Sequence, residues 1–168
     1  MGDFILLGKL GIVGVSECTC IFGNNRIEHK TGRMMTEENA FEWPIRIYYE
    51  DTDVGGIVYH ANYLKFFERA RTELFRSAGV SLSDQFAEKI SFVVRHMDID
   101  FLKGAQLDDE LVVRTWPNSV RKASIEFCQV LVNNNGQTLC KALVQVACVH
   151  PDTLKPIKIP ENIMSEIF

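Results

Sequence analysis

The sequence predicts an α+β domain in which a curved antiparallel sheet wraps around one long helix. An amphipathic helical pattern comes first, and several strand-like stretches separated by turn residues follow it. The helix pattern covers residues 61–78, and the strand patterns cover residues 90–101, 110–116, 123–132 and 138–149. Consecutive strands joined by turns pair antiparallel, and such a sheet buries one face against a helix. With 168 residues, 46% of them hydrophobic, the chain can build one core.

Turn and capping residues separate the predicted elements. Residues 45–50 form a β-branched and aromatic strand candidate that must join the later sheet, and Gly55 and Gly56 mark a tight loop after it. The long helix should stop at Gly79, and a short helix over residues 81–88 should follow, capped by Ser81. Among the strands, residues 133–136 give a strong hairpin signal, residues 119–122 a weaker one, and residues 103–109 a longer connection.

Residues 1–42 read as a tail before the domain of residues 43–168. Lys9 interrupts the apolar stretch of residues 4–15, which has no signal-peptide features and is too short to span a bilayer. Because Met34 and Met35 stand directly before the regular pattern, the tail is either sequence upstream of the natural start or a loosely attached extension. We expect that removing residues 1–34 leaves fold and activity intact.

Composition excludes several classes of function. The chain has 18 Lys and Arg against 22 Asp and Glu, a net charge of -4, so it lacks the surplus positive charge that nucleic acids and anionic membranes require. Five cysteines fit neither a disulfide framework nor paired zinc knuckles, which favours a reducing compartment. Cys18 and Cys20 have only His29 as a plausible third ligand, so we expect no metal there.

The densest cluster of reactive side chains lies between Glu50 and His60, where a strand candidate meets the long helix. It holds three carboxylates, two glycines and a histidine. Such a loop offers an acid or base beside helix-start N–H groups that can hold a negatively charged oxygen. Two other interpretations remain: a calcium loop, although Gly55 and Asn62 stand where ligands are needed, and ordinary turn carboxylates before a helix-start histidine.

The same loop and the helix after it carry a family resemblance. Residues 47–63, IYYEDTDVGGIVYHANY, and residues 66–73, FFERARTE, resemble the signature of the YbgC-like acyl-CoA thioesterases. These enzymes belong to the 4-hydroxybenzoyl-CoA thioesterase group of hotdog-fold proteins, and bacterial members are associated with the Tol-Pal envelope system. The resemblance covers about residues 43–165 and implies the hotdog fold, in agreement with the order of elements.

The resemblance also implies roles for residues. Asp53 matches the family's catalytic carboxylate, as general base or as nucleophile, and the backbone N–H of His60 matches its oxyanion donor, while a role for the His60 side chain stays open. Glu68 is a second-choice acid, although a surface pair with Lys65 or Arg71 is its simpler interpretation.

Other residues are candidates for binding or packing. We expect Gly55, Gly56, Val58 and Tyr59 to line the substrate site. Arg121 and Lys122 either meet the phosphates of coenzyme A or form a solvated turn. His96, Cys128, Cys140 and Cys148 are expected to be packing residues on strands.

The resemblance therefore implies a cytoplasmic thioesterase that hydrolyses acyl-CoA, or acyl groups on acyl carrier protein, without metal or organic cofactor. We expect a dimer or a tetramer of dimers with sites at the subunit interface. Two rival functions remain: a non-catalytic acyl-carrier or envelope-complex binding module, and a hotdog hydratase or dehydratase that would use His60 and Glu68. The acyl group is not specified by the sequence.

Overall fold

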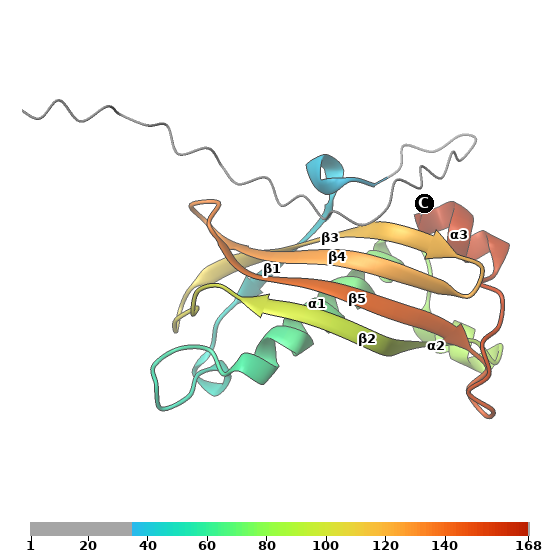
Figure 1. Cartoon of the computed structure of the whole chain (residues 1–168), viewed down its shortest axis with the longest axis horizontal. Coiled ribbons are helices and arrows are strands. Elements are labelled where there is room, and N and C mark those ends of the chain that lie inside the picture. Colours follow the sequence, from blue (N-terminus) through green and yellow to red (C-terminus); the bar gives the residue numbers. More distant parts are fainter. Residues whose placement is uncertain (1–34, 168) are drawn as a thin grey trace, which may run out of the picture. The chain divides into compact units, whose positions relative to one another are not determined.

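The computed structural model describes residues 35–167. Its elements, in chain order, are η1 (Glu37–Asn39), β1 (Phe41–Arg46), η2 (Tyr49–Asp51), α1 (His60–Ser77), α2 (Leu82–Ala87), β2 (Ser91–Phe101), β3 (Glu110–Arg121), β4 (Ser124–Asn133), β5 (Thr138–Val149) and α3 (Glu161–Ile167). The strands form one five-stranded sheet in the order β1-β3-β4-β5-β2, and all neighbouring pairs are antiparallel. Figure 1 shows α1 behind this sheet.

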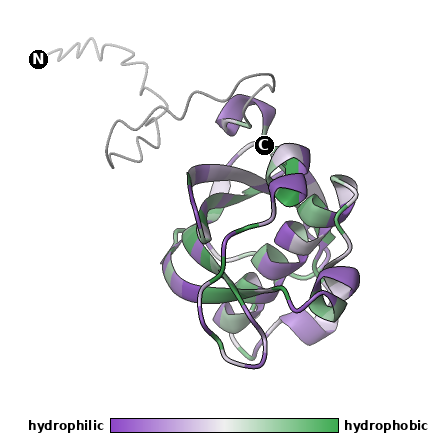
Figure 2. Ribbon diagram, turned by 90° about the vertical axis from the view of Figure 1, so that its right-hand side faces the viewer, coloured by the Kyte–Doolittle hydropathy of each residue, from purple (hydrophilic) through white to green (hydrophobic). Residues whose placement is uncertain are grey.

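The core lies between α1 and the sheet. Helix α1 buries the aromatic and aliphatic residues that recur at three- and four-residue spacing, among them Phe66, Phe67, Ala70 and Leu74. Alternate strand residues meet them from the other side, as in β4, where Ile125, Phe127 and Leu131 are fully buried. Figure 2 shows the curved sheet with α1 against one of its faces, so the predicted α+β architecture of sheet and long helix is confirmed.

The prediction for the first strand was wrong in its position. The strand covers Phe41–Arg46, and the predicted residues 47–50 instead run into the 3-10 turn Tyr49–Asp51. Pro44 argued against a strand at this position, because proline has no N–H to donate to a sheet. It is tolerated here because β1 is an edge strand, which among the described strands pairs with β3 alone. Strand β1 therefore begins two residues before residue 43, where the domain is predicted to start.

Later boundaries follow the prediction with two differences. Strand β3 continues to Arg121 instead of ending at Trp116, because a register shift between Pro117 and Ser119 absorbs the proline. The short helix α3 was not predicted. The short helix capped by Ser81 and the turn at residues 133–136 are confirmed.

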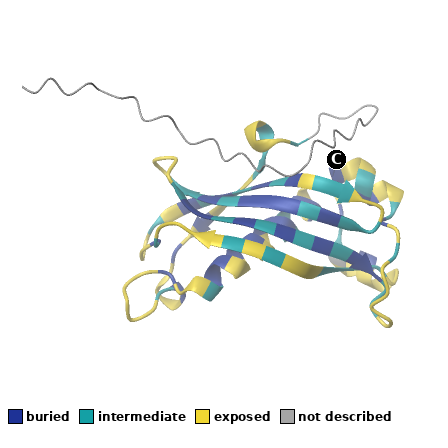
Figure 3. Ribbon diagram, viewed as in Figure 1, coloured by how far each residue is buried: buried dark blue, intermediate teal, exposed yellow. Residues whose placement is uncertain are grey.

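Burial divides the domain between its helix-facing core and its edges. Strands β3, β4 and β5 carry most of the buried sheet residues, whereas β2 and the loop before α1 are largely exposed (Figure 3). Within residues 35–167, β2 pairs only with β5, so its other side is an edge without a described partner strand. Within the described part of the chain, no helix has the length and apolar character needed to cross a membrane. The predictions for residues 1–34, including Cys18, Cys20 and His29, lie outside the described residues.

Candidate active site

The loop between η2 and α1, residues 51–59, is folded as a tight hairpin, and we call it the Asp53 loop. Thr52 and Val58 form an antiparallel bridge. The Asp53 N–H donates to the Ile57 carbonyl at 3.0 Å, and the Tyr59 N–H donates to the Asp51 carbonyl at 2.8 Å. Gly56 turns the chain with φ +75°, a conformation that other residues rarely adopt. Backbone hydrogen bonds therefore fix the shape of this exposed loop.

Asp53 stands at the tip of the loop, exposed to solvent. Its Oδ1 accepts a hydrogen bond from the Gly55 N–H at 2.8 Å. A Cβ at Gly55 would lie 3.0 Å from the same oxygen, so glycine allows this close approach. The Oδ2 atom makes no hydrogen bond with the described residues. The carboxylate is thus oriented through one oxygen, while the other is available to a ligand.

His60 is the first residue of α1, and its backbone N–H has no hydrogen-bond partner among the described residues. The N-cap residue, Tyr59, contributes no side-chain cap. Unpaired N–H groups and the helix dipole give such a helix start a partial positive charge. The His60 ring packs against Tyr59, with centroids 4.4 Å apart, and lies edge-on to Phe101 at 6.2 Å. Aromatic contacts therefore hold the imidazole beside the free N–H.

Asp51 has a different environment from Asp53, although only one residue separates them. It is 8% exposed, and its Oδ2 accepts the Tyr48 N–H at 2.9 Å. Its carbonyl oxygen accepts both the Tyr59 N–H and the Asn62 side-chain amide, the latter at 3.0 Å. Asp51 therefore ties the base of the loop to the first turn of α1.

The structure separates the other candidate residues. Gly55 and Gly56 accompany Asp53 at the tip, Tyr59 is half-exposed at the helix start, and Val58 is buried in the core. Arg121 and Lys122 lie at the β3–β4 turn, at the end of the sheet opposite the Asp53 loop (Figure 1). Within one subunit, these two basic residues are not brought to Asp53.

Glu68 lies on the exposed side of α1 and does not form the ion pairs expected for it. Its Oε1 accepts a hydrogen bond from the Thr72 hydroxyl at 2.8 Å. Neither Lys65 nor Arg71 comes within ion-pair distance in the described structure. The reason is the direction of Arg71, whose guanidinium turns into the core.

Sequence reasoning missed a buried polar cluster of Arg71, Gln129 and Thr115. Arg71 Nη1 donates to Gln129 Oε1 at 2.6 Å, and Gln129 Nε2 donates to the Phe67 carbonyl at 2.9 Å and to Thr115 Oγ1 at 3.0 Å. Burial lowers the pKa of Arg71 to about 10, and the negative charge of Glu68 opposes this shift. The only sequence signal was a polar residue, Gln129, at an inward strand position.

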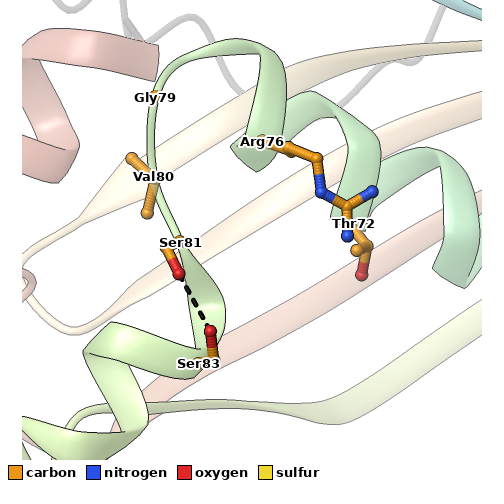
Figure 4. A pocket seen from close by; sticks show the side chains of 6 residues that line it. All are labelled: Thr72, Arg76, Gly79, Val80, Ser81 and Ser83. Carbon is orange, nitrogen blue, oxygen red and sulfur yellow. Dashed lines mark hydrogen bonds between the residues drawn. The ribbon is translucent and has the colours of Figure 1, made fainter.

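Two pockets lie along α1, away from the tip of the Asp53 loop. One, of about 110 Å³, is bounded by Glu68, Arg71 and Thr72 and by apolar residues, Phe75, Phe92, Val94 and Val146. The other, of about 330 Å³, lies at the C-terminal end of α1 and is lined by Thr72, Arg76, Gly79, Val80, Ser81 and Ser83. Figure 4 shows the Ser81 and Ser83 hydroxyls facing each other, 3.0 Å apart.

The remaining candidate ligands do not assemble. Among the described residues, no group of three His, Cys, Asp or Glu side chains could hold a metal ion. Cys128, Cys140 and Cys148 are buried on their strands, which confirms their packing role. His96, in contrast, was wrongly expected to pack: its strand position faces away from α1, where its exposed ring contacts Asp98 at 3.2 Å.

Comparison with known proteins gives matches in both sequence and structure. The family model of the Thioesterase superfamily matches residues 55–140. The acyl-CoA thioester hydrolase YbgC of Escherichia coli O6:H1 is 46% identical over 126 residues, which cover 75% of this chain and 94% of that protein.

Solved structures agree with these matches. The probable thioesterase from Bartonella henselae matches with a TM-score of 0.66 and 35% identity, covering 71% of this chain and 98% of that chain. A 1,4-dihydroxy-2-naphthoyl-CoA thioesterase from Synechocystis matches with a TM-score of 0.72, over 76% of this chain and 95% of that chain. Its identity is 22%, so this second likeness shows the shared fold alone.

Proposed function

Because this chain belongs to the YbgC-type acyl-CoA thioesterases of the hotdog-fold Thioesterase superfamily, we propose that it hydrolyses acyl-CoA with Asp53 as its catalytic carboxylate and the His60 N–H as its oxyanion donor. The observation that carries this proposal is an exposed carboxylate on a fixed loop beside a helix start with an unpaired N–H. The products are a free acid and coenzyme A. The reaction needs no metal and no organic cofactor.

The surroundings of Asp53 support a role in chemistry. A carboxylate that solvent and ligands can reach is able to accept a proton from water or to attack a carbonyl carbon. The hydrogen bond from Gly55 leaves Oδ2 for this purpose. Asp51 has no such freedom, because its carboxylate is buried and bonded to Tyr48.

The helix start supports the oxyanion role. As the thioester carbonyl is attacked, its oxygen gains negative charge, which an N–H donor at a helix N-terminus stabilises. The His60 N–H has no competing acceptor among the described residues. The Thr52–Val58 bridge joins the two segments that lead to Asp53 and to His60, which supports the proposal that one thioester contacts both groups.

Two routes remain within this proposal. As general base, Asp53 would remove a proton from water; as nucleophile, it would form a mixed anhydride that water then opens. A single turnover in ¹⁸O-labelled water tests the nucleophilic route, because label enters Asp53 only when water opens an anhydride at the Asp53 carbonyl carbon. Attack of water at the acyl carbon, by either route, puts the label into the product acid. We favour the general base.

Self-association is the third part of the proposal. Strand β2 (Ser91–Phe101) is a long unpaired edge without proline, whereas the other edge, β1, is short and contains Pro44. Unpaired edges readily pair with a second strand, so β2 is the edge that a second copy of this chain would use. A neighbouring subunit would also be needed to bring Arg121 and Lys122 to the phosphates of coenzyme A.

The main test is turnover by the wild type and by Asp53→Asn on a panel of acyl-CoA thioesters, followed by thiol release. The amide keeps the size of the side chain but can neither accept the proton nor attack, so we expect kcat to fall by about 10²- to 10⁴-fold with KM nearly unchanged. His60→Ala should lose less, because it keeps the backbone N–H. Loss of less than about tenfold in Asp53→Asn would make Glu68 the leading candidate.

The same panel of thioesters tests the rival functions. Thioesters of acyl carrier protein should be included as a second carrier. Hydration of an enoyl thioester would identify a hydratase, and binding without turnover would identify a binding module.

The assembly is tested by light scattering, which should give a molar mass of at least twice the 19.1 kDa of one chain. A fully active monomer would contradict a site shared between subunits.

A further inference from the structure

The connection between β2 and β3, residues 102–109, is hydrogen-bonded to the chain on both sides of the tip of the Asp53 loop, and we call it the clamp segment. Before the loop, between β1 and η2, the Ile47 N–H donates to the Asp109 carbonyl at 3.0 Å, and the Asp108 N–H donates to the Ile47 carbonyl at 3.1 Å. Near the end of the loop, the Val58 N–H donates to the Ala105 carbonyl at 2.8 Å. One short segment therefore bonds to the chain before the loop and to the loop itself.

Ala105 joins the loop to the helix as well. It is fully buried, and its N–H donates to the Tyr63 hydroxyl, one turn into α1, at 3.0 Å. The backbone of this single residue thus bonds to α1 on one side and to Val58 on the other. The clamp segment itself is anchored, because the Leu102 and Lys103 N–H groups both donate to the Leu139 carbonyl of β5.

Gly104 of the clamp segment lies against Ile57 of the Asp53 loop. A Cβ added at Gly104 would lie 2.9 Å from Ile57 Cγ2 and 3.1 Å from Ile57 Cβ. Ile57 Cδ1 would also lie 3.1 Å from the added Cβ, so two of the three crowding atoms, including the nearest, lie beyond Ile57 Cβ. A side chain at residue 104 therefore pushes Ile57, and with it the Asp53 loop, away from the clamp segment by a few tenths of an ångström.

We propose that Gly104 is a positioning residue, which sets the place of Asp53 relative to the start of α1 by allowing the clamp segment to close against Ile57. This inference rests on the proposed function of Asp53. The tip of the loop offers little packing that would fix its position on the domain. Val54 is fully exposed, and a Cβ added at Gly56 would meet no described atom within 4 Å. A misplacement of about 1 Å at a reacting group can cost about 10²-fold in rate.

The test compares Gly104→Ala, Ile57→Ala and the double variant in kcat, KM and thermal unfolding. We expect Gly104→Ala to lose at least about tenfold in kcat with KM changed by less than about threefold, as for a misplaced catalytic group. Ile57→Ala removes Cγ2 and Cδ1, so the double variant should recover most of the lost kcat. Wild-type kcat in Gly104→Ala, or no recovery in the double variant, would overturn the proposal.

Gly136→Ala is the matched control. Gly136 has φ +72° and no neighbour within 4 Å of an added Cβ, so alanine strains the backbone there without displacing the Asp53 loop. We expect lower stability with unchanged kcat. An equal loss of kcat in this control would show that general destabilisation explains Gly104→Ala, and the proposal would be wrong.

Hydrogen exchange supplies a readout that does not depend on catalysis. Gly104→Ala should accelerate exchange of the Asp53 and Val58 amides, which bond to Ile57 and Ala105, by at least about tenfold, and Ile57→Ala should reverse the effect. Unchanged exchange would overturn the clamp whatever the kinetics show. Conversely, altered exchange together with a fully active Asp53→Asn would uphold the clamp and reject the proposed function.

Discussion

Asp53 and Arg71 are both charged and both lie beside α1, but their surroundings are opposite. Asp53 stands exposed at a loop tip, and one of its oxygens has no hydrogen bond with the described residues. Arg71 is 7% exposed and points at Gln129, whose amide is in turn bonded to Phe67 and Thr115. The polar groups of the buried cluster satisfy one another, whereas the carboxylate of the loop is left for a ligand.

Because of this difference, we expect the buried cluster to contribute mainly to stability and the Asp53 loop mainly to activity. In the Asp53 loop, backbone hydrogen bonds hold the shape, so the side chain at the tip carries little of the folding energy. In the buried cluster, each side chain is a hydrogen-bond partner of another buried polar group, so its loss leaves buried polar atoms without that partner. Substitutions in the two regions should therefore have separable effects.

The largest effect on stability is expected for Gln129→Leu. This change leaves the Arg71 guanidinium, the Phe67 carbonyl and the Thr115 hydroxyl without their present partner in the core. We expect the free energy of unfolding to fall by about 3 kcal/mol or more, measured by urea denaturation. Asp53→Asn, by contrast, should leave it within about 0.5 kcal/mol of the wild type, as for other surface substitutions.

A double variant sharpens this prediction. Arg71→Met removes the buried charge that Gln129→Leu would leave without its partner. The double variant should therefore lose less free energy of unfolding than the sum of the two single losses. Additive losses would mean that Arg71 and Gln129 do not depend on each other. The cluster would then not act as the unit that its hydrogen bonds indicate.

A smaller effect is expected for Asp51→Asn. The amide oxygen can still accept the Tyr48 N–H, but a neutral acceptor bonds more weakly than a carboxylate, so we expect a loss of about 1 kcal/mol in stability. Because Asp51 is not the proposed catalytic group, kcat should change by only a few-fold, and Glu50→Gln should behave alike. If kcat fell as far in Asp51→Asn as in Asp53→Asn, the assignment of catalysis to Asp53 and of a structural role to Asp51 would be wrong.

The sequence predicted the elements with strong periodic patterns and missed those that depend on tertiary contacts. The long helix was predicted to within a residue because its apolar spacing is regular, as were β2 and β5. The first strand was misplaced because Pro44 is acceptable only at a sheet edge, and the edge position of β1 was not visible in the sequence.

The candidate site shows the same division. Residue chemistry located the loop, but only the family resemblance distinguished Asp53 from Asp51, because burial and hydrogen bonding separate them in three dimensions. The Arg71–Gln129 contact joins residues 58 positions apart, and Gly104 meets Ile57 across a gap of similar length, so neither contact leaves a local pattern. Arg121 and Lys122 were placed on the correct turn, yet the fold puts that turn at the far end of the sheet.

The smallest expected effect concerns two buried thiols, Cys140 and Cys148, which extend the comparison to core groups outside the polar cluster. Burial raises the pKa of Cys140 to about 12 and that of Cys148 to about 11, because the thiolate is poorly solvated in the core. The unfolded chain ionises these thiols at lower pH, so it binds fewer protons than the native state above about pH 9, and stability falls as pH rises. Between pH 9 and 10 the loss should be at most about 1 kcal/mol for each thiol. Urea denaturation of the wild type and of the Cys140→Ala/Cys148→Ala variant isolates this contribution, because the other titrating groups are common to both. If the free energy of unfolding fell with pH at the same rate in both proteins, the thiols would not contribute to the pH dependence.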